Sequence, residues 1–208
     1  MIDTPLFQRV ADEIADAGRF LYSRGWVPAT SGNFSGRLDD QHYALTASGR
    51  HKGELQRKDI LVVDRNGDPV DSQLRPSAET LLHTTLYQHF PECGAVLHTH
   101  SVNATVLSKL AGDADEIILE DYEVLKAFQG NTTHDTVERI PLFPNTQDMV
   151  QLGKDLAQRL EQQPNIHGFL IQGHGLYTWG RDMNETRRHI EAFEFLFECD
   201  MEMRRCSR

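Results

Sequence analysis

The stretch Ala95-Val96-Leu97-His98-Thr99-His100 joins a short apolar run to a pair of histidines. Its length and apolar character predict a β-strand. Residues two apart on a strand point to the same face, so the two imidazoles lie roughly 6–7 Å apart along it and can converge on one ion. This spacing predicts a metal half-site, although two hydrogen-bonded or exposed histidines at a strand end would have the same pattern.

A third histidine, His174, is the candidate that completes the half-site, because catalytic zinc commonly has three protein ligands and an open position. It lies between Gly173 and Gly175, directly after the apolar run Phe169-Leu170-Ile171. Flanking glycines allow the backbone to bend and to approach another element closely. The alternative is a hairpin turn whose polar tip happens to be a histidine.

On either side of this stretch, short strands and helical patterns alternate irregularly. We predict helices at 5–23, from Ser77 as N-cap to about 90, at 102–110, at 121–128, from Thr146 as cap to 163, and from 182 or 184 onward. We predict strands at 43–46, 60–64, 95–100, 117–119 and two within 168–180, and a loop of small polar residues at 30–37. The pattern indicates one mixed α/β layered domain over residues 1–208.

Small polar residues gather in three segments that offer hydroxyls, an amide and free backbone N–H groups. The segments are Ser31-Gly32-Asn33, Thr46-Ala47-Ser48-Gly49 and Pro76-Ser77. Ser77 lies at an expected helix N-terminus, where the helix dipole favours an anion. Together the segments could hold a phosphate, with Lys52 or Arg50 adding positive charge, but ordinary turns are built from the same residue types. No Walker A or Rossmann fingerprint is present, so nucleotide binding is not indicated.

Two carboxylates are candidates for proton transfer. Glu79 is expected one turn into the helix that follows Ser77, and Glu123 lies in the segment 120–126. A carboxylate near a metal can move a proton on the carbon next to a metal-bound carbonyl. A solvated helix acid is the alternative for both. The other seven histidines are expected to be surface or hydrogen-bonded core residues: His42, His51, His83, His89, His134, His167 and His189.

Composition excludes several classes of partner. The 208 residues contain 21 Lys and Arg against 31 Asp and Glu, a formal net charge of −10. Nucleic acid and anionic membranes require a basic face, so neither is expected as a partner. No run approaches the roughly 20 apolar residues of a membrane helix. The three cysteines have no CxxC spacing, which favours a reducing cytoplasm.

Five motifs occur in an order that resembles the class II (zinc) aldolase and adducin family. They are Ser31-Gly32-Asn33, Thr46-Ala47-Ser48-Gly49, Ser77-Ala78-Glu79, His98-Thr99-His100 and His174, and they span nearly the whole chain. The resemblance implies a single three-layer α/β/α domain with a central, largely antiparallel sheet. It also implies a homotetramer with active sites near the subunit interfaces.

The resemblance further implies the roles of the site residues. It implies one Zn²⁺ per subunit, with His98, His100 and His174 as ligands. It places the phosphate of a sugar phosphate against Asn33, Ser48, Gly49 and Ser77, and Lys52 adds charge there.

Several segments are more similar to the dehydratase members of this family than to its aldolases, namely 26–35, 48–53, 75–80 and 173–180. Ala78 stands where the aldolases often have a second serine. The resemblance therefore implies zinc-dependent loss of water from 5-methylthioribulose 1-phosphate, a step of methionine salvage. Glu123 matches the position of the catalytic glutamate of the dehydratases, and Glu79 is the second choice of base.

Three other interpretations stay open at this point. Glu79 stands where the aldolases have their acid–base glutamate, so an aldolase or epimerase acting on another sugar phosphate is the first. A non-enzymatic interaction module like the head of adducin is the second, but it predicts lost metal ligands. A purely structural metal site is the third, and it predicts a closed coordination shell.

Overall fold

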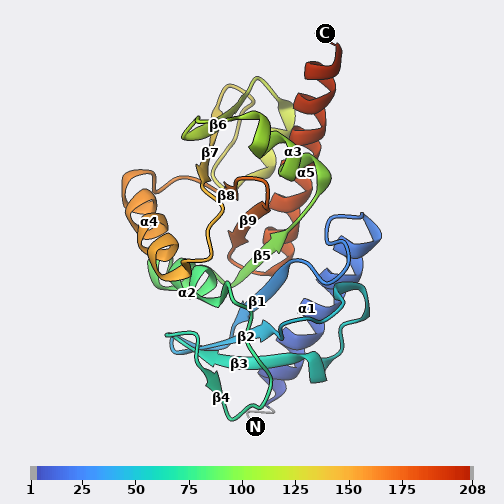
Figure 1. The fold of residues 1–208 in the computed structure, drawn as a ribbon, viewed down its shortest axis with the longest axis vertical. Helices are drawn as coiled ribbons and strands as arrows, with labels where there is room; N and C mark the ends of the chain where they lie inside the picture. The colour runs from blue at the N-terminus through green and yellow to red at the C-terminus, as the bar shows by residue number, and fades with distance from the viewer. Residues whose placement is uncertain (1–3, 207–208) are drawn as a thin grey trace.

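A single β-sheet runs through the computed structural model, which describes residues 4–206. Within these residues nine strands form the sheet in the order β4-β3-β2-β1-β5-β9-β8-β7-β6 (Figure 1). Their bounds are β1 Asn33–Arg37, β2 His42–Thr46, β3 Ile60–Asp64, β4 Pro69–Val70, β5 Ala95–Thr99, β6 Glu116–Glu120, β7 Val137–Phe143, β8 Gly168–Ile171 and β9 Gly175–Gly180. Neighbouring strands are antiparallel except for the parallel pair β7 and β8, so the expected largely antiparallel sheet is confirmed.

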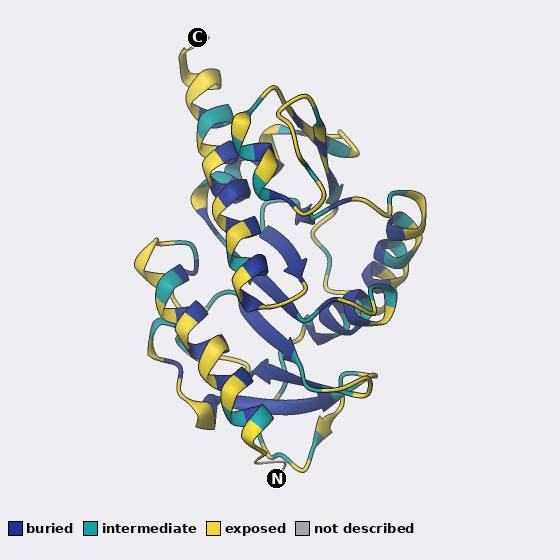
Figure 2. Ribbon diagram, turned by 180° about the vertical axis from the view of Figure 1, so that it is seen from behind, coloured by how far each residue is buried: buried dark blue, intermediate teal, exposed yellow. Residues whose placement is uncertain are grey.

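Helices cover both faces of this sheet. Their bounds are α1 Pro5–Ser23, α2 Thr80–His89, α3 Val102–Leu110, α4 Met149–Gln162 and α5 Met183–Cys206, with 3-10 turns η1 Lys52–Glu54, η2 Arg57–Asp59 and η3 Glu123–Ala127. One apolar core lies under α1, α3 and α5, and a second lies under α2 and α4. Figure 2 shows α1 and α5 in front of the buried strands, with their exposed residues turned outward. The predicted three-layer α/β/α architecture is thereby confirmed.

Helix α1 shows how the sequence pattern produces this packing. Thr4 is its N-cap, because its side chain accepts a hydrogen bond from the N–H of Phe7 over 3.1 Å. Val10, Ile14 and Leu21 recur at helical spacing and are buried against the sheet. The predicted helix at 5–23 is therefore confirmed.

Most predicted strands lie where the sequence pattern puts them, within one or two residues at the ends. The segments 43–46, 60–64, 95–100 and 117–119 correspond to β2, β3, β5 and β6, and the pair within 168–180 corresponds to β8 and β9. Strands β4 and β7 are not among the predicted elements.

The prediction of a loop over 30–37 is wrong for its second half, because Asn33–Arg37 forms the central strand β1. This strand pairs with both β2 and β5. Its small residues allow close packing by α1: a Cβ atom at Gly36 would lie 2.4 Å from Cγ1 of Val10. Tertiary packing here outweighs the low strand propensity of Ser and Gly.

Two predicted helix starts are shifted. Glu79, not Ser77, occupies the N-cap position of α2, and the Ser77 hydroxyl instead accepts a hydrogen bond from the Glu79 N–H over 3.3 Å. Asp148, not Thr146, caps α4 by accepting from the N–H of Gln151. The segment predicted as a helix at 121–128 is the 3-10 turn η3. The expected domain span of 1–208 includes residues 1–3 and 207–208, which lie outside the described residues.

Candidate metal centre

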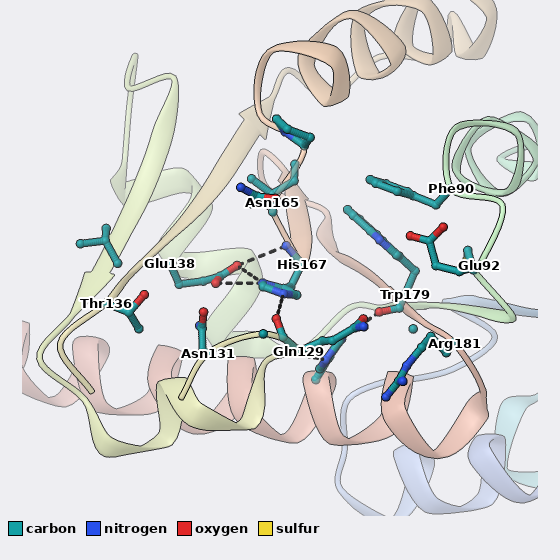
Figure 3. A pocket seen from close by; sticks show the side chains of 17 residues that line it. Phe90, Glu92, Gln129, Asn131, Thr136, Glu138, Asn165, His167, Trp179 and Arg181 are labelled. Atoms are coloured by element: carbon teal, nitrogen blue, oxygen red, sulfur yellow. Dashed lines mark hydrogen bonds and ion pairs between the residues drawn. The ribbon is translucent and has the colours of Figure 1, made fainter. Parts of the chain in front are cut away.

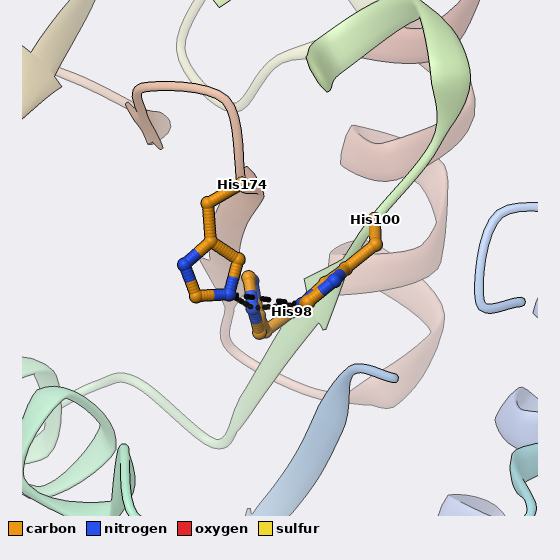
Figure 4. Close-up of side chains that lie close together, drawn as sticks. All are labelled: His98, His100 and His174. Atoms are coloured by element: carbon orange, nitrogen blue, oxygen red, sulfur yellow. Dashed lines mark hydrogen bonds between the residues drawn. The ribbon is translucent and has the colours of Figure 1, made fainter. Parts of the chain in front are cut away.

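Three histidine rings meet at one point above the sheet (Figure 4). The distances between their Nε2 atoms are 2.8 Å for His98 and His100, 3.0 Å for His100 and His174, and 3.3 Å for His98 and His174. A tetrahedral ion with Zn–N bonds of about 2.0–2.1 Å holds its nitrogen ligands roughly 3.3–3.4 Å apart. The three nitrogens therefore lie close to the positions that a bound ion requires, and the predicted triad is brought together.

Strand β5 fixes the orientation of His98. Its Nδ1 lies 2.9 Å from the backbone oxygen of Leu176, so Nδ1–H donates to that carbonyl and the lone pair of Nε2 faces the centre. The ring is fully buried and stacks on Tyr177 with 3.8 Å between ring centroids. Burial lowers the pKa of His98 well below its ordinary value, which favours the neutral form that binds a metal.

The other two histidines are positioned by loops. The backbone N–H of His100, which follows β5, donates to the oxygen of Trp26 over 2.8 Å. His174 lies in the turn between β8 and β9, where Gly173 adopts a positive φ of 65° and donates its N–H to the hydroxyl of Ser108 over 2.9 Å. The predicted glycine-flanked turn is confirmed, and it carries His174 to the end of β5.

Glu79 lies against the triad. Its carboxylate is 3.0 Å from Nε2 of His174 and 3.5 Å from Nε2 of His98. It accepts hydrogen bonds from the amide of Asn33 over 2.6 Å and from the hydroxyl of Tyr177 over 2.9 Å. Burial raises the pKa of Glu79, but the electrostatic interaction with the His98 ring and the hydrogen bonds from His174 and Asn33 outweigh the effect of burial, so the pKa lies below its usual range. A carboxylate held ionised at this point can accept a proton or bind a cation.

The residues predicted to hold a phosphate line one cavity of about 170 Å³ next to the triad. Its lining includes Asn33, Ser48, Gly49, Lys52 and Ser77, together with Glu79 and His100. The loops from β1, β2 and the segment before α2 therefore converge as the sequence predicts.

Lys52 lines this cavity with a buried side chain. The residue is 2% exposed, and its Nζ donates to the backbone oxygens of Thr30 over 2.9 Å and Arg50 over 2.7 Å. Two carbonyl acceptors leave one N–H of the ammonium for a further acceptor. Burial lowers the pKa of Lys52 to about 8, while the charge of Glu79 raises it in part.

Glu123 is not among the residues that line this cavity. It lies on η3 with a side chain 70% exposed, and it pairs with Lys126 and with His134, whose Nδ1 is 3.8 Å away. The structure thus brings together the predicted site residues except Glu123 and Arg50, whose Nε lies 3.4 Å from the carboxylate of Asp59 outside this cavity.

Sequence reasoning missed Tyr177 and gave His83 no role. Tyr177 pairs with His98 across β5 and β9, and its hydroxyl contacts Glu79. His83 is 1% exposed beneath Asn33, and His189 is equally buried, so their expected place as hydrogen-bonded core residues is confirmed. The only available signal for Tyr177 was its position three residues after His174.

A second cavity of about 600 Å³ lies at the other end of β5 and β9, where Ala95 pairs with Gly180. Figure 3 shows Glu138 pointing to His167, with the closest contact to Nδ1 at 3.0 Å. Phe90 and Trp179 stack beside this pair. No histidine of the triad lines this cavity, which therefore belongs to a separate region of the molecule.

A fold of this kind with a three-histidine centre is matched by a known family. The chain belongs to the class II aldolase and adducin family, because the model of the Class II Aldolase and Adducin N-terminal domain matches residues 12–201. Within residues 4–206, no helix is both long and apolar enough to cross a membrane.

Two similar proteins are named methylthioribulose-1-phosphate dehydratase. The one from Marinobacter nauticus is 54% identical over 208 residues, which cover 100% of both chains. The one from Pseudomonas aeruginosa is 53% identical over 201 residues, covering 97% of this chain and 98% of the relative.

Among solved structures, YgbL from Escherichia coli has a TM-score of 0.79 at 28% identity, covering 93% of this chain and 88% of that one. An L-fuculose-1-phosphate aldolase from Thermus thermophilus has a TM-score of 0.77 at 21% identity, covering 97% and 98%. The second likeness shows the fold alone.

Proposed function

We propose that this chain removes water from 5-methylthioribulose 1-phosphate and forms 5-methylthio-2,3-dioxopentyl 1-phosphate. The observation that carries the proposal is the converging histidine triad in a chain that is 54% identical, over its full length, to a relative named for this reaction. The reaction places the chain in methionine salvage. We further propose that it acts in the cytoplasm as a homotetramer.

Zinc is the metal that we assign to His98, His100 and His174, one ion per subunit. Three neutral imidazoles and an open position are the ligand set of catalytic zinc sites. When bound, such an ion supplies Lewis-acid stabilisation of negative charge on the substrate oxygens at C2 and C3. The hydrogen bond from His98 to Leu176 holds that ring in the tautomer that binding needs.

The cavity beside the triad suits the phosphate. Ser48 and Ser77 offer hydroxyl donors, and Gly49 offers a backbone N–H without a side chain to block approach. Lys52 supplies positive charge, and its two backbone acceptors hold the ammonium in place. Asn33 contacts Glu79 and therefore joins the phosphate pocket to the carboxylate beside the triad.

Proton transfer is assigned to Glu123. Its carboxylate takes the proton from C3, and the electron pair of that C–H bond forms an enolate whose negative charge lies on the C2 oxygen. As the C2 carbonyl forms again, the pair makes the C3–C4 double bond and the C4–O bond breaks. The hydroxyl leaves C4 as water after receiving a proton, which Glu123 can return. The resulting enol then tautomerises to the 2,3-diketone.

In this proposal, Glu123 reaches the triad of a neighbouring subunit when the chains assemble. Its side chain is 70% exposed and stands apart from the triad of its own chain. In a homotetramer with sites at the subunit interfaces, it would act on substrate held by a neighbouring copy. Glu79 is the second choice of base, because it already lies 3.0 Å from His174 within one chain.

An aldolase or epimerase acting on another sugar phosphate is the second candidate. Glu79 beside the triad favours it, because retro-aldol cleavage needs an acid–base group at the metal. A product assay on 5-methylthioribulose 1-phosphate separates the two: the proposal predicts a diketone with the full carbon chain. Release of an aldehyde and a shorter phosphate, or no reaction, would contradict it.

A further inference from the structure

A row of buried polar side chains connects Glu79 to the interior beneath α2. Asn33 donates to Glu79, and its Oδ1 lies within hydrogen-bond distance of Nε2 of His83. Nδ1 of His83 is 2.7 Å from the hydroxyl of Ser35, which is 2.8 Å from the hydroxyl of Tyr87. Four members of this row, Asn33, Ser35, His83 and Tyr87, are at most 5% exposed.

The direction of every hydrogen bond in this row follows from chemistry. The Asn33 amide turns its NH₂ toward the Glu79 carboxylate, so its Oδ1 is an acceptor and Nε2 of His83 must carry a proton. Burial lowers the pKa of His83 to about 4, so the ring is neutral and its Nδ1 is an acceptor. The Ser35 hydroxyl therefore donates to Nδ1 and accepts from Tyr87.

All the donors consequently point toward Glu79. Tyr87 donates to Ser35, Ser35 to His83, His83 to Asn33 and Asn33 to the carboxylate. Hydrogen bonds aligned in this way polarise one another in a low-dielectric interior. The edge of Tyr177 packs against the His83 ring with 5.8 Å between centroids, which restricts rotation of the imidazole.

We propose that His83 is a positioning residue, whose Nε2–H holds the Asn33 amide in the orientation that donates to Glu79 and so fixes that carboxylate beside the triad. Without this donor, the Asn33 amide can rotate and turn its Oδ1 toward the Glu79 carboxylate. The two groups would then repel each other, because both carry negative charge on oxygen. The inference rests on the proposed function only where turnover is measured. The tautomer of His83 is independent of any activity.

Variants of His83 separate positioning from packing. In His83→Gln the side-chain amide can still donate to Asn33, because it extends as far as the ring Nε2. In His83→Asn the shorter amide stands near the place of Nδ1 and cannot reach Asn33. We expect His83→Asn to lower kcat about 10- to 100-fold with KM and zinc content nearly unchanged, and His83→Gln to restore most of kcat.

His89→Gln on the same helix is the matched control, since His89 packs on Phe90 away from the row. It should leave kcat unchanged. Equal kcat in His83→Asn and His83→Gln, whether high or low, would overturn the positioning role. A higher KM with an unchanged kcat in His83→Asn would overturn it as well.

Nitrogen-15 spectra of the histidines in the metal-free protein give the test that needs neither activity nor a stable variant. We expect His83 to show the Nε2–H tautomer across neutral pH. An Nδ1–H tautomer or a charged ring would overturn the inference. If the wild type shows this tautomer but does not dehydrate the substrate, the proposed function fails and the hydrogen-bond assignment stands.

Discussion

Gly175 packs directly on Thr99: a Cβ atom at position 175 would lie 1.9 Å from the carbonyl oxygen of Thr99. This contact joins β9 to the end of β5, between His98 and His174. We predict that Gly175→Ala destabilises the fold by about 1–3 kcal/mol and lowers zinc affinity, because the two strands must separate. Chemical denaturation and zinc titration measure the two effects.

Gly153→Ala is the control for this substitution. A Cβ atom at Gly153 would meet only the Thr85 hydroxyl oxygen, at 3.4 Å, in the interior of α4. Alanine favours a helix over glycine, so this variant should be as stable as the wild type or more so. Equal stability of the two alanine variants would show that the β5–β9 contact is not the constraint described.

Replacement of Glu123 tests its assignment as the base. Glu123→Gln should lower kcat by at least about 100-fold while zinc content stays at one ion per chain, because a proton acceptor is lost and no ligand is touched. Glu120→Gln, at an exposed neighbouring position, is the control. Full activity of Glu123→Gln would transfer the role of base to Glu79.

Complementation tests whether Glu123 acts across a subunit interface. Neither Glu123→Gln nor His174→Ala should turn over substrate alone. When the two are refolded together, some sites combine an intact triad with Glu123 of a neighbour, so activity should return. A mixture that stays inactive although native mass spectrometry detects mixed tetramers would contradict shared sites.

Glu194 makes the stability of the fold depend on pH. It is 2% exposed on α5, and burial raises its pKa to about 8, with an addition from Glu198 and a partial offset from Ser101. The unfolded chain loses this proton near pH 4.5, so the free energy of unfolding should fall as the pH rises from 4.5 toward 8.

Glu194→Gln removes this titration. Its free energy of unfolding should exceed that of the wild type by about 1 kcal/mol or more at pH 8, and the gain should shrink toward pH 5. Urea denaturation across this range measures the difference. A wild type and variant with parallel pH profiles would mean that Glu194 is already ionised in the folded state.

Local patterns were sufficient to predict the triad. Alternation along the strand puts His98 and His100 on one face, and two glycines identify the turn of His174. Both features depend on a few neighbouring residues, which is why sequence reasoning could find them.

Such local patterns could not predict the pairing of strands that are far apart in the sequence. Strand β1 lies between β2 and β5, and Asn33 pairs with His98 although 65 positions separate them in the numbering. Its Ser and Gly residues are typical of a loop, and the strand is explained by its pairing with β2 and β5 and by the close packing of α1. The same holds for Tyr177 and His83, whose roles depend on contacts with Glu79 and Asn33 that no spacing predicts.

The central claim is that the three histidines hold the zinc on which dehydration depends. Its most direct test is a zinc titration of metal-free protein, with diketone formation from 5-methylthioribulose 1-phosphate followed at each step. Turnover should rise until one zinc is bound per chain. Zinc should restore no turnover in the triad variants His98→Ala, His100→Ala and His174→Ala, whereas the control His42→Asn should respond like the wild type. Turnover by the metal-free protein, or by a triad variant without bound zinc, would contradict the claim.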